Sequence, residues 1–280
     1  MRAGGDSPTL KKRAVSRKLV ELRKARGLTG VYVRRQLGWS STKLDYAENN
    51  LWAKPNSDAV IDLCELYGVE GDQRDALVRL AREGRQRGWW HRYKDVFPDE
   101  YPGFESCAEH VRAFETTLIP GLLQVPAYIE LITRASGIDD ARGIQRRLDA
   151  SVERQKILTR DHCSRLHAVV DENAILRITD PAIRRAQISH LIQITGRPNV
   201  EVQILPIAAG VYPVPGEPFT CLGFADPGEP DIVFRESSIG DRLAEEPDKV
   251  DRYMSRFGRL AAVALSPKAT RAMLTRQHAG

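Results

Sequence analysis

Cysteine is scarce in this 280-residue sequence, and its four copies are irregularly spaced. They are Cys64, Cys107, Cys163 and Cys221, so no Cys-x-x-Cys pair occurs. Structural zinc sites and the disulfide frameworks of small secreted domains both require closer and more regular spacing. We therefore expect no metal site and no disulfide framework, and we expect reduced thiols as in a cytoplasmic protein.

Long apolar runs are missing as well. A helix that spans a membrane needs about 20 predominantly apolar residues, and a secretory signal needs an apolar core after its basic residues. The opening stretch MRAGGDSPTLKKR has no such core. We expect a cytoplasmic protein without a membrane segment, whose hydrophobic fraction of 42% is large enough for buried cores.

Recognisable catalytic motifs are also absent from the sequence. It contains no Gly-rich phosphate loop, no Gly-x-Ser-x-Gly and no His-Glu-x-x-His. His162, Cys163 and His167 are the closest group to a site, but their spacing matches no metal signature. Asp171 and Glu172 could line a pocket, although a turn at the end of a strand is the favoured interpretation. We expect no enzyme, no catalytic residue and no cofactor; a hydrolase-like tail is the alternative.

The charge is distributed unevenly along the chain. Residues 1–54 hold 13 Lys and Arg against 4 Asp and Glu, a net charge of +9, whereas residues 55–280 hold 29 against 33, a net of −4. A basic head on a slightly acidic body is typical of a polyanion-binding module joined to a different domain. A solvated tail that contributes Lys11, Lys12 and Arg13 would explain only part of the excess.

The stretch 28–50, LTGVYVRRQLGWSSTKLDYAENN, predicts a helix followed by a tight turn. Val33 and Leu37 are spaced i, i+4 and share one helical face. Gly38 follows where the helix must end and the backbone needs a positive φ. This is the first half of a helix-turn-helix.

The second half of the stretch predicts another short helix. Ser40 or Ser41 can cap it by accepting a hydrogen bond from a free N–H group. Leu44 and Ala47 would line its inner face, and Asn50 would end it because Asn tolerates the left-handed conformation. In helix-turn-helix proteins this second helix enters the major groove of DNA.

The rest of the N-terminal region predicts a small helical domain. Residues 1–13 are rich in Gly, Ser, Pro and charge, which indicates a disordered tail. Apolar spacing then predicts a helix from Ser16, and Ser57 and Asp72 are expected at the starts of two more. Together with the pair above, five short helices over residues 14–83 form the expected DNA-binding domain.

Residues 84–103 differ in composition from their surroundings and indicate a linker between domains. Trp89, Trp90, His91 and Tyr93 could form an aromatic cage for a ligand. The favoured interpretation is that these side chains hold the two domains together as core, because large aromatic groups bury well.

Residues 104–280 predict an α+β domain with a small, mostly antiparallel sheet. Apolar runs predict strands at 166–176, 200–207, 219–224 and 231–236. Helices are predicted within 105–135, over 139–160, after Asp180, over 249–264 and after Ser266. In the first of these, Cys107, Val111 and Phe114 are spaced for one face. The last helix, with Met273 and Leu274, is the expected surface for dimerisation.

At this point the sequence resembles a known family. GLTGVYVRRQLGWSSTKLDYAEN is similar to the helix-turn-helix of phage-repressor-like regulators of the xenobiotic-response-element (XRE) type. With RGWWHRYKDVFP, ETTLIPGLLQVPAYIELI, VVDENAILR, PNVEVQILPIAAG and DKVDRYMSRFGRLAAVALSP in order, residues 14–276 resemble the actinobacterial Scr1-type regulators. Those regulators have antitoxin-like features. The resemblance implies specific DNA binding by the head and binding of a ligand or a small partner protein by the tail.

Four positions depart from that family pattern. The family usually has Ala at the position of Arg34, and it often has Gln, Ser and Arg where this recognition helix has Ser41, Asp45 and Tyr46. Arg34 must either extend outward along its stem or disturb the helix pair. Asp45 can accept a hydrogen bond from a cytosine amine but repels phosphates. We therefore expect a different operator and modest affinity for DNA.

The predicted DNA contacts lie near the start and on the outward side of the second helix. The candidates for base edges are Ser41, Thr42, Lys43, Asp45 and Tyr46. Thr29 caps the preceding helix, whose N–H groups can hold a phosphate, and Arg35 is a further phosphate candidate. Other phosphate candidates are Arg17, Lys18 and Lys54. The alternative for each is a solvated surface charge or a plain cap.

These observations predict a DNA-binding transcriptional regulator. A homodimer would read two half-sites of double-stranded DNA about one helical turn (~34 Å) apart. Its C-terminal domain would respond to a ligand or a small partner protein encoded nearby. The alternative is an antitoxin-like interaction module that sequesters the small partner and binds DNA weakly or not at all.

Overall fold

The computed structural model of the chain describes residues 7–52, 54–97, 100–160, 164–212, 217–235 and 242–279. The chain divides into two compact units, Met1–Arg92 and Tyr93–Gly280. Each unit has a hydrophobic core of its own. The division falls within the segment 84–103 that the sequence marks as a linker.

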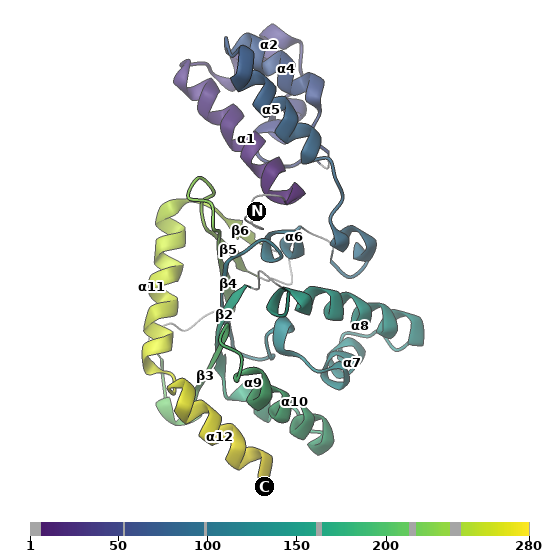
Figure 1. Ribbon diagram of the computed structural model, residues 1–280, viewed down its shortest axis with the longest axis vertical. Coiled ribbons are helices and arrows are strands. Elements are labelled where there is room, and N and C mark those ends of the chain that lie inside the picture. Colours follow the sequence, from purple (N-terminus) through teal and green to yellow (C-terminus); the bar gives the residue numbers. More distant parts are fainter. Residues whose placement is uncertain are drawn as a thin grey trace. The chain divides into compact units, whose positions relative to one another are not determined.

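The first unit is a bundle of five helices (Figure 1). In order they are α1 (Pro8–Ala25), α2 (Gly30–Leu37), α3 (Ser41–Glu48), α4 (Ser57–Leu66) and α5 (Gly71–Glu83). The core contains Val15 and Leu19 from α1 together with Val60 and Leu63 from α4, and all four side chains are fully buried. The predicted helical N-terminal region is therefore confirmed.

The first helix begins earlier than the sequence predicts. α1 starts at Pro8, so residues 8–13 are helical rather than part of a disordered tail. Proline suits the first turn of a helix because it has no N–H group to leave unpaired. The added turns pack against the end of α5, where Lys11 Nζ lies 3.0 Å from a Glu83 carboxylate oxygen. Gly84 lets the α1 backbone come close, since a Cβ atom there would lie 3.1 Å from the Lys12 nitrogen.

The cap of α4 is also one residue earlier than predicted. The Asn56 carboxamide oxygen accepts hydrogen bonds from the backbone N–H groups of Asp58 and Ala59 at 2.9 and 3.4 Å. Asn56 is therefore the N-cap, and Ser57 is the first helical residue. Both residue types cap helices well, so the sequence alone does not decide between them.

The aromatic residues after α5 form the short 3-10 helix η1 (Trp89–Tyr93). The Trp89 and Trp90 rings meet edge to face with centroids 6.2 Å apart, and Trp90 stacks on His91 at 5.6 Å. Trp90 also covers Gly88, where a Cβ atom would lie 1.8 Å from the indole ring. These rings pack on one another, and the ligand cage considered above stays an alternative.

The second unit contains a six-stranded sheet in the order β3-β2-β1-β4-β5-β6. The strands are β1 (His110–Glu115), β2 (Arg165–Asp171), β3 (Val200–Leu205), β4 (Phe219–Gly223), β5 (Ile232–Arg235) and β6 (Arg242–Ala244). The β1–β2 and β2–β3 pairings are parallel, and the β1–β4, β4–β5 and β5–β6 pairings are antiparallel. Helices plus a sheet confirm the α+β class. The sheet is mixed and larger than predicted.

Strand β1, next to the middle of the sheet, is the main correction to the predicted elements. In the 105–135 region the helical prediction is wrong around Val111 and Phe114, whose spacing with Cys107 indicated one helical face, whereas the later part of the region is helical as α7 (Pro126–Ala135). In the strand, Val111 and Phe114 point to opposite faces of the sheet, and both are buried. A strand that is buried on both faces lacks the alternation that would distinguish it from a helix.

The strand predicted over 166–176 ends at Asp171, and the chain turns into the short helix α9 (Asn173–Leu176). An Asp171 carboxylate oxygen accepts a hydrogen bond from Asn173 N at 2.9 Å. A Glu172 carboxylate oxygen accepts another from Ile207 N at 2.9 Å. The two acids therefore fix a turn at the strand end, as the favoured interpretation expects.

Helices cover both faces of the sheet (Figure 1). The other α-helices of the described ranges are α6 (Tyr101–Glu105), α7 (Pro126–Ala135), α8 (Ala141–Gln155), α10 (Pro181–Ile194), α11 (Pro247–Val263) and α12 (Pro267–Ala279), with 3-10 turns η2 (Gly121–Leu123), η3 (Lys156–Leu158) and η4 (Ile207–Ala209). Helix α11 lies along one face, where Phe257 packs with Phe114. Helices α6 to α10 lie on the other face. In the described parts of the chain, no helix has the run of apolar side chains that a bilayer crossing demands.

The α11–α12 junction closes the β3 edge of the sheet. Leu265 N donates to the Ile204 carbonyl at 2.9 Å, and Ile204 N donates to Thr270 Oγ1 at 3.0 Å. Met273 and Leu274 of α12 are buried within this unit. This pair therefore belongs to the core of the second unit, and dimerisation through the rest of the last helix stays a prediction.

Candidate nucleic-acid interface

Helices α2 and α3 form the predicted helix-turn-helix. Gly38 takes the left-handed conformation at φ 64°, and the N–H of the next residue, Trp39, donates to the Arg34 carbonyl at 2.9 Å. Ser40 Oγ accepts a hydrogen bond from Lys43 N at 3.2 Å, so Ser40 is the cap of α3. Ser41, the other candidate cap, is the first residue of α3 and is exposed.

The inner side of α3 is fixed by apolar packing. Leu44 and Ala47 are buried with Val33 of α2 in the core of the first unit, as predicted. A Cβ atom at Gly30 would lie 3.5 Å from the Leu44 side chain, so the start of α2 also rests on α3. The helix pair is intact around Arg34, which is half-buried, so this departure from the family pattern leaves the packing undisturbed.

A charged clamp that the sequence does not predict joins α3 to α1. Arg23 Nε and NH2 donate to the two Glu48 carboxylate oxygens at 2.6 and 2.8 Å, and NH1 donates to the Leu28 carbonyl at 2.9 Å. Only 16% of the Arg23 side chain and 11% of the Glu48 side chain are exposed. The bidentate bond to Glu48 raises the pKa of Arg23. The clamp therefore sets the C-terminal end of α3 against α1.

The clamp lies close to Tyr67, which is buried. Burial raises the pKa of the Tyr67 hydroxyl, and the negative charge of Glu48 raises it further. Because Arg23 and Glu48 are 25 positions apart, no local pattern could have indicated their contact. The only hint in the sequence is that each charged residue stands beside apolar positions of the core.

The outward side of α3 carries all five predicted base-edge candidates. They are Ser41, Thr42, Lys43, Asp45 and Tyr46, and each is exposed. Tyr46 leaves 48% of its surface in solvent. The Lys43 ammonium lies 3.8 Å from the centroid of the Trp39 ring, which positions its charge at the start of the helix. The face therefore presents hydroxyl groups, one cation, one carboxylate and one phenol.

Two predicted phosphate contacts lie on α2. Thr29 caps this helix by accepting a hydrogen bond from Tyr32 N at 3.2 Å, and Arg35 is exposed in its last turn. The N-terminal N–H groups of a helix, such as those of Gly30 and Val31, suit an anion.

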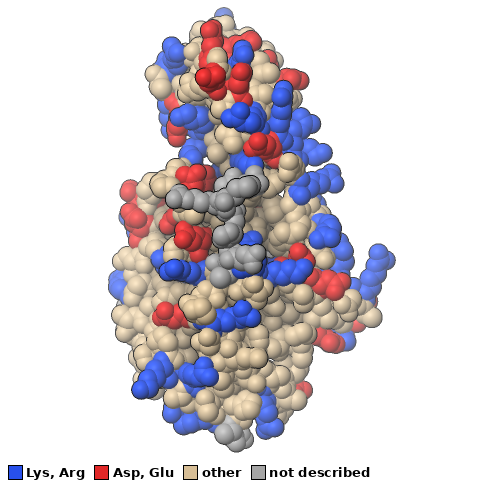
Figure 2. Space-filling view, in the orientation of Figure 1, with Lys and Arg blue, Asp and Glu red and all other residues tan. Residues whose placement is uncertain are grey.

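The other phosphate candidates do not form one cluster of cations. Arg17 and Lys18 both pair with Glu21 on α1, at 3.8 and 3.0 Å, which reduces their net positive charge. Lys54 is exposed. Both signs of charge are interspersed on the visible face of the first unit (Figure 2).

A group of exposed apolar side chains near α3 was not predicted as part of the site. Val31 and Tyr32 on α2 and Leu51 after α3 expose 66%, 44% and 58% of their surfaces. Val31 and Tyr32 directly precede the buried Val33, so they fall outside the apolar helical face. That position outside the face was the feature of the sequence that could have indicated their exposure. Apolar groups on a DNA-reading surface can contact thymine methyl groups.

Two protein-family models match parts of this chain. A model described as "Helix-turn-helix domain" matches residues 14–77. A model described as "Domain of unknown function (DUF5753)" matches residues 99–276, more than half of the chain. The chain belongs to the DUF5753 family. No curated protein and no solved structure gives a match.

For this DUF5753 protein, the helix-turn-helix match supports a DNA-binding regulator. The matched residues include α2, its turn and α3, so the sequence match and the geometry agree on the same segment. The DUF5753 region coincides with most of the second unit, and its description assigns no function.

The second unit of the DUF5753 protein shows no metal-ligand constellation in its described residues. His167 Nε2 lies 2.7 Å from Gln203 Oε1, and the imidazole meets Phe257 edge to face. His162 and Cys163, which the sequence groups with His167, lie outside the described residues.

Proposed function

We propose that the protein is a transcriptional regulator that binds double-stranded DNA with sequence specificity. The observation that carries this proposal is the α3 surface, where Ser41, Thr42 and Tyr46 are exposed on a helix fixed by Leu44 and by the Arg23–Glu48 clamp. In the proposed complex α3 enters the major groove, as in helix-turn-helix proteins. The Thr29-capped end of α2 and Arg35 contact phosphates.

The proposed working form is a homodimer in the cytoplasm that reads two half-sites about one helical turn (~34 Å) apart. Its second unit responds to a ligand or a small partner protein, and this response changes the affinity for DNA. The resemblance to XRE-type and Scr1-type regulators supports these finer features. The proposal assigns no catalytic step to either unit.

The charges of the reading surface predict weak dependence on salt. Each phosphate neutralised by a cation contributes about −0.9 to the slope of log K against log salt. Lys43 and Arg35 are the exposed cations on α2 and α3, and Asp45 opposes them. We therefore expect a shallower slope than a protein with six or more phosphate contacts would give.

Binding to the promoter fragment of the chain's own gene tests the proposal. We expect saturable binding that weakens with salt, and about a tenfold loss for Ser41→Ala or Lys43→Ala if a base-edge contact is removed. Arg74→Ala is the matched control, because Arg74 is exposed on α5 and pairs with Asp75 outside the helix-turn-helix. Absence of binding even at low salt would contradict the proposal.

Two observations favour a second candidate function. Asp45 adds a negative charge to the exposed surface of α3, and Glu21 partly neutralises Arg17 and Lys18 on α1. In this alternative the protein sequesters a small partner protein, and its DNA binding is weak or lost. Co-purification with a small protein encoded nearby, together with no DNA binding at low salt, would favour the alternative.

A further inference from the structure

The second unit contains a cavity on the sheet face that carries α6 to α8 (Figure 1). Its volume is about 530 Å³, within the range of small-molecule sites. Residues of α6, α7 and α8 line it, together with the η2 turn and strand β5. All of these elements belong to one unit, so the cavity is independent of the helix-turn-helix.

Apolar side chains form about half of the cavity wall. Ile119, Ile129 and Ile132 supply an aliphatic side, and Phe234 and Tyr101 supply an aromatic side. The Tyr101 and Phe234 rings stack with centroids 4.0 Å apart. A rigid aromatic pair beside branched aliphatic groups suits the hydrocarbon or ring portion of a ligand.

Helix α8 adds a polar stripe to this wall. Arg147, Ser151 and Arg154 are spaced i, i+4, i+7 and all three line the cavity. Arg154 is matched by an internal acid, because its Nε and NH2 donate to the two Glu105 carboxylate oxygens at 2.5 and 2.8 Å. Glu105 is buried, and it also accepts a hydrogen bond from the Tyr101 hydroxyl at 2.8 Å.

Arg147 differs from Arg154 in having no acid within ion-pair distance among the residues that the structure describes. Asp95, whose pKa is lowered in part by the charge of Arg147, is bound by the neighbouring Arg146 at 2.6 and 2.9 Å. A guanidinium group beside apolar side chains attracts an anion, and its planar donors fit a carboxylate, sulfonate or phosphate group. Glu115 at the end of β1 also lines the cavity, so the anionic group belongs at the α8 side.

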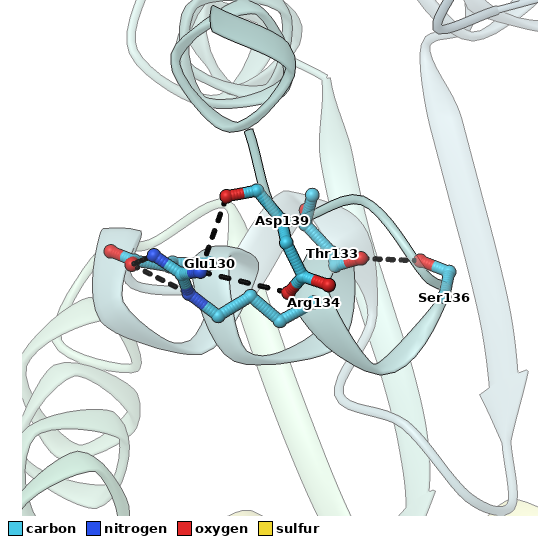
Figure 3. Close-up of polar contacts among 5 residues, drawn as sticks. All are labelled: Glu130, Thr133, Arg134, Ser136 and Asp139. Atoms are coloured by element: carbon cyan, nitrogen blue, oxygen red, sulfur yellow. Dashed lines mark hydrogen bonds and ion pairs between the residues drawn. The ribbon is translucent and has the colours of Figure 1, made fainter. Parts of the chain in front are cut away.

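The rim of the cavity at the end of α7 is fixed by local polar contacts (Figure 3). Arg134 donates to Glu130 at 2.8 and 3.0 Å and lies 3.7 Å from Asp139. The Ser136 hydroxyl donates to the Thr133 carbonyl at 2.9 Å. Thr133 and Ser136 line the cavity, whereas Glu130, Arg134 and Asp139 lie beside it on the exposed surface of this unit.

We propose that this cavity binds a small organic anion with an aromatic or aliphatic body. The acidic group contacts Arg147 and the Ser151 hydroxyl, and the body packs between Ile129, Ile132 and Phe234. The site gives a chemical class to the ligand response proposed above, but binding itself does not depend on DNA.

Two fluorescent probes with the same ring system separate the acidic contact from apolar packing. 8-Anilinonaphthalene-1-sulfonate carries an anion, and N-phenyl-1-naphthylamine lacks it. With the full-length protein we expect saturable binding of the sulfonate at one site. Arg147→Gln should weaken sulfonate binding about tenfold, as expected for one charge-assisted contact, and change binding of the neutral probe less than about twofold.

Arg142→Gln is the matched control, since Arg142 is exposed on the same helix and does not line the cavity. Ser151→Trp should fill the cavity and reduce binding of both probes, and thermal melting shows whether each variant is folded. Absence of saturable sulfonate binding, or equal affinity in the wild type and Arg147→Gln, would overturn the proposal. Loss of DNA binding alone would contradict the regulator function and leave the cavity result standing.

Discussion

At the scale of single residues, an ion pair holds helix α3 against α1. The Arg23–Glu48 pair has bidentate geometry and is mostly shielded from solvent, whereas the Lys18–Glu21 pair is exposed. Exposed pairs contribute about 0.2–1 kcal/mol, whereas losing one partner of a shielded pair leaves a charge without compensation. The Arg23–Glu48 pair therefore contributes more to stability than the Lys18–Glu21 pair, although the N···O distance is short in both pairs.

We predict that Glu48→Ala lowers the free energy of unfolding of the first unit by about 1–3 kcal/mol, because Arg23 loses its partner. Glu21→Ala is the control, and we expect less than about 1 kcal/mol there. Urea unfolding followed by circular dichroism gives both values. Equal losses for the two variants would show that the Arg23–Glu48 contact is not formed in solution.

Buried thiols give a residue-scale prediction for pH. Burial raises the pKa of the Cys64 thiol to about 11 and that of Cys221 to about 12. The unfolded chain releases these protons near pH 9, whereas the folded chain keeps them. Above pH 9 the unfolded state therefore binds fewer protons, and the free energy of unfolding should fall as the pH rises toward 11.

Thiol alkylation read by mass spectrometry provides the matching measurement. In the folded protein at pH 8 we expect Cys64 and Cys221 to react far more slowly than the half-buried Cys107. All three should react alike in urea. Fast labelling of Cys221 in the folded protein would contradict its burial.

At the scale of elements, caps and faces determine what each helix can contribute. Ser40 and Ser41 are adjacent and chemically identical, yet one bonds to the backbone of α3 and the other faces solvent. Strand β1 and helix α8 show the same dependence on context. Phe114 is buried in the core of the second unit, whereas Val152 on α8 is 50% exposed.

We predict different effects for alanine substitution of the two serines, one on stability and the other on DNA binding. Ser40→Ala should destabilise the first unit by about 1 kcal/mol because α3 loses its cap. Ser41→Ala should leave stability unchanged within about 0.5 kcal/mol and weaken DNA binding. Thermal melting and a DNA-binding titration on both variants check the pair. If Ser41→Ala is the destabilising change, the cap assignment is wrong.

Strand β1 can be tested by truncation. Phe114→Ala should cost about 3–5 kcal/mol of stability because it leaves a cavity beneath α11. Val152→Ala on α8 should cost less than about 0.5 kcal/mol, since its side chain is half-exposed. Comparable costs for the two changes would contradict the buried position of Phe114 in the observed strand.

At the scale of the whole molecule, the chain consists of a basic helical unit and a unit that contains the sheet. The helix-turn-helix match and the DUF5753 match fall mainly on separate units, so the proposed DNA contact and the proposed ligand site lie on different units. Coupling between two such sites is typically worth a factor of about 5–150 in affinity.

For the proposed homodimer, we predict that DNA binding depends on the spacing of its half-sites. Inserting about 5 base pairs between them places the second site on the opposite side of the duplex and should abolish tight binding. Inserting about 10 base pairs, close to one full helical turn, returns the second half-site to the same side of the duplex and should restore tight binding. A spacing series measured by gel shift gives the result. Equal binding at every spacing would indicate that one copy binds alone.

The sequence by itself determined the helix-turn-helix, because the information is local. Val33, Gly38 and Leu44 lie within about twenty residues, and hydrogen bonds there connect near neighbours, although the sequence left the cap of α3 open between Ser40 and Ser41. The charge excess and the exposed α3 residues were visible for the same reason. A continuous pattern of this kind specifies a helix before any packing is considered.

Only the tertiary structure decided the strand β1, the mixed sheet and the cavity. Each depends on residues far apart in the chain, such as Glu105 with Arg154 or Tyr101 with Phe234. Buried segments lose the alternation that a sequence pattern requires, and ion pairs over long separations leave no periodic signal. The polar wall of the cavity therefore becomes visible only when α6, α8 and the sheet are brought together by packing.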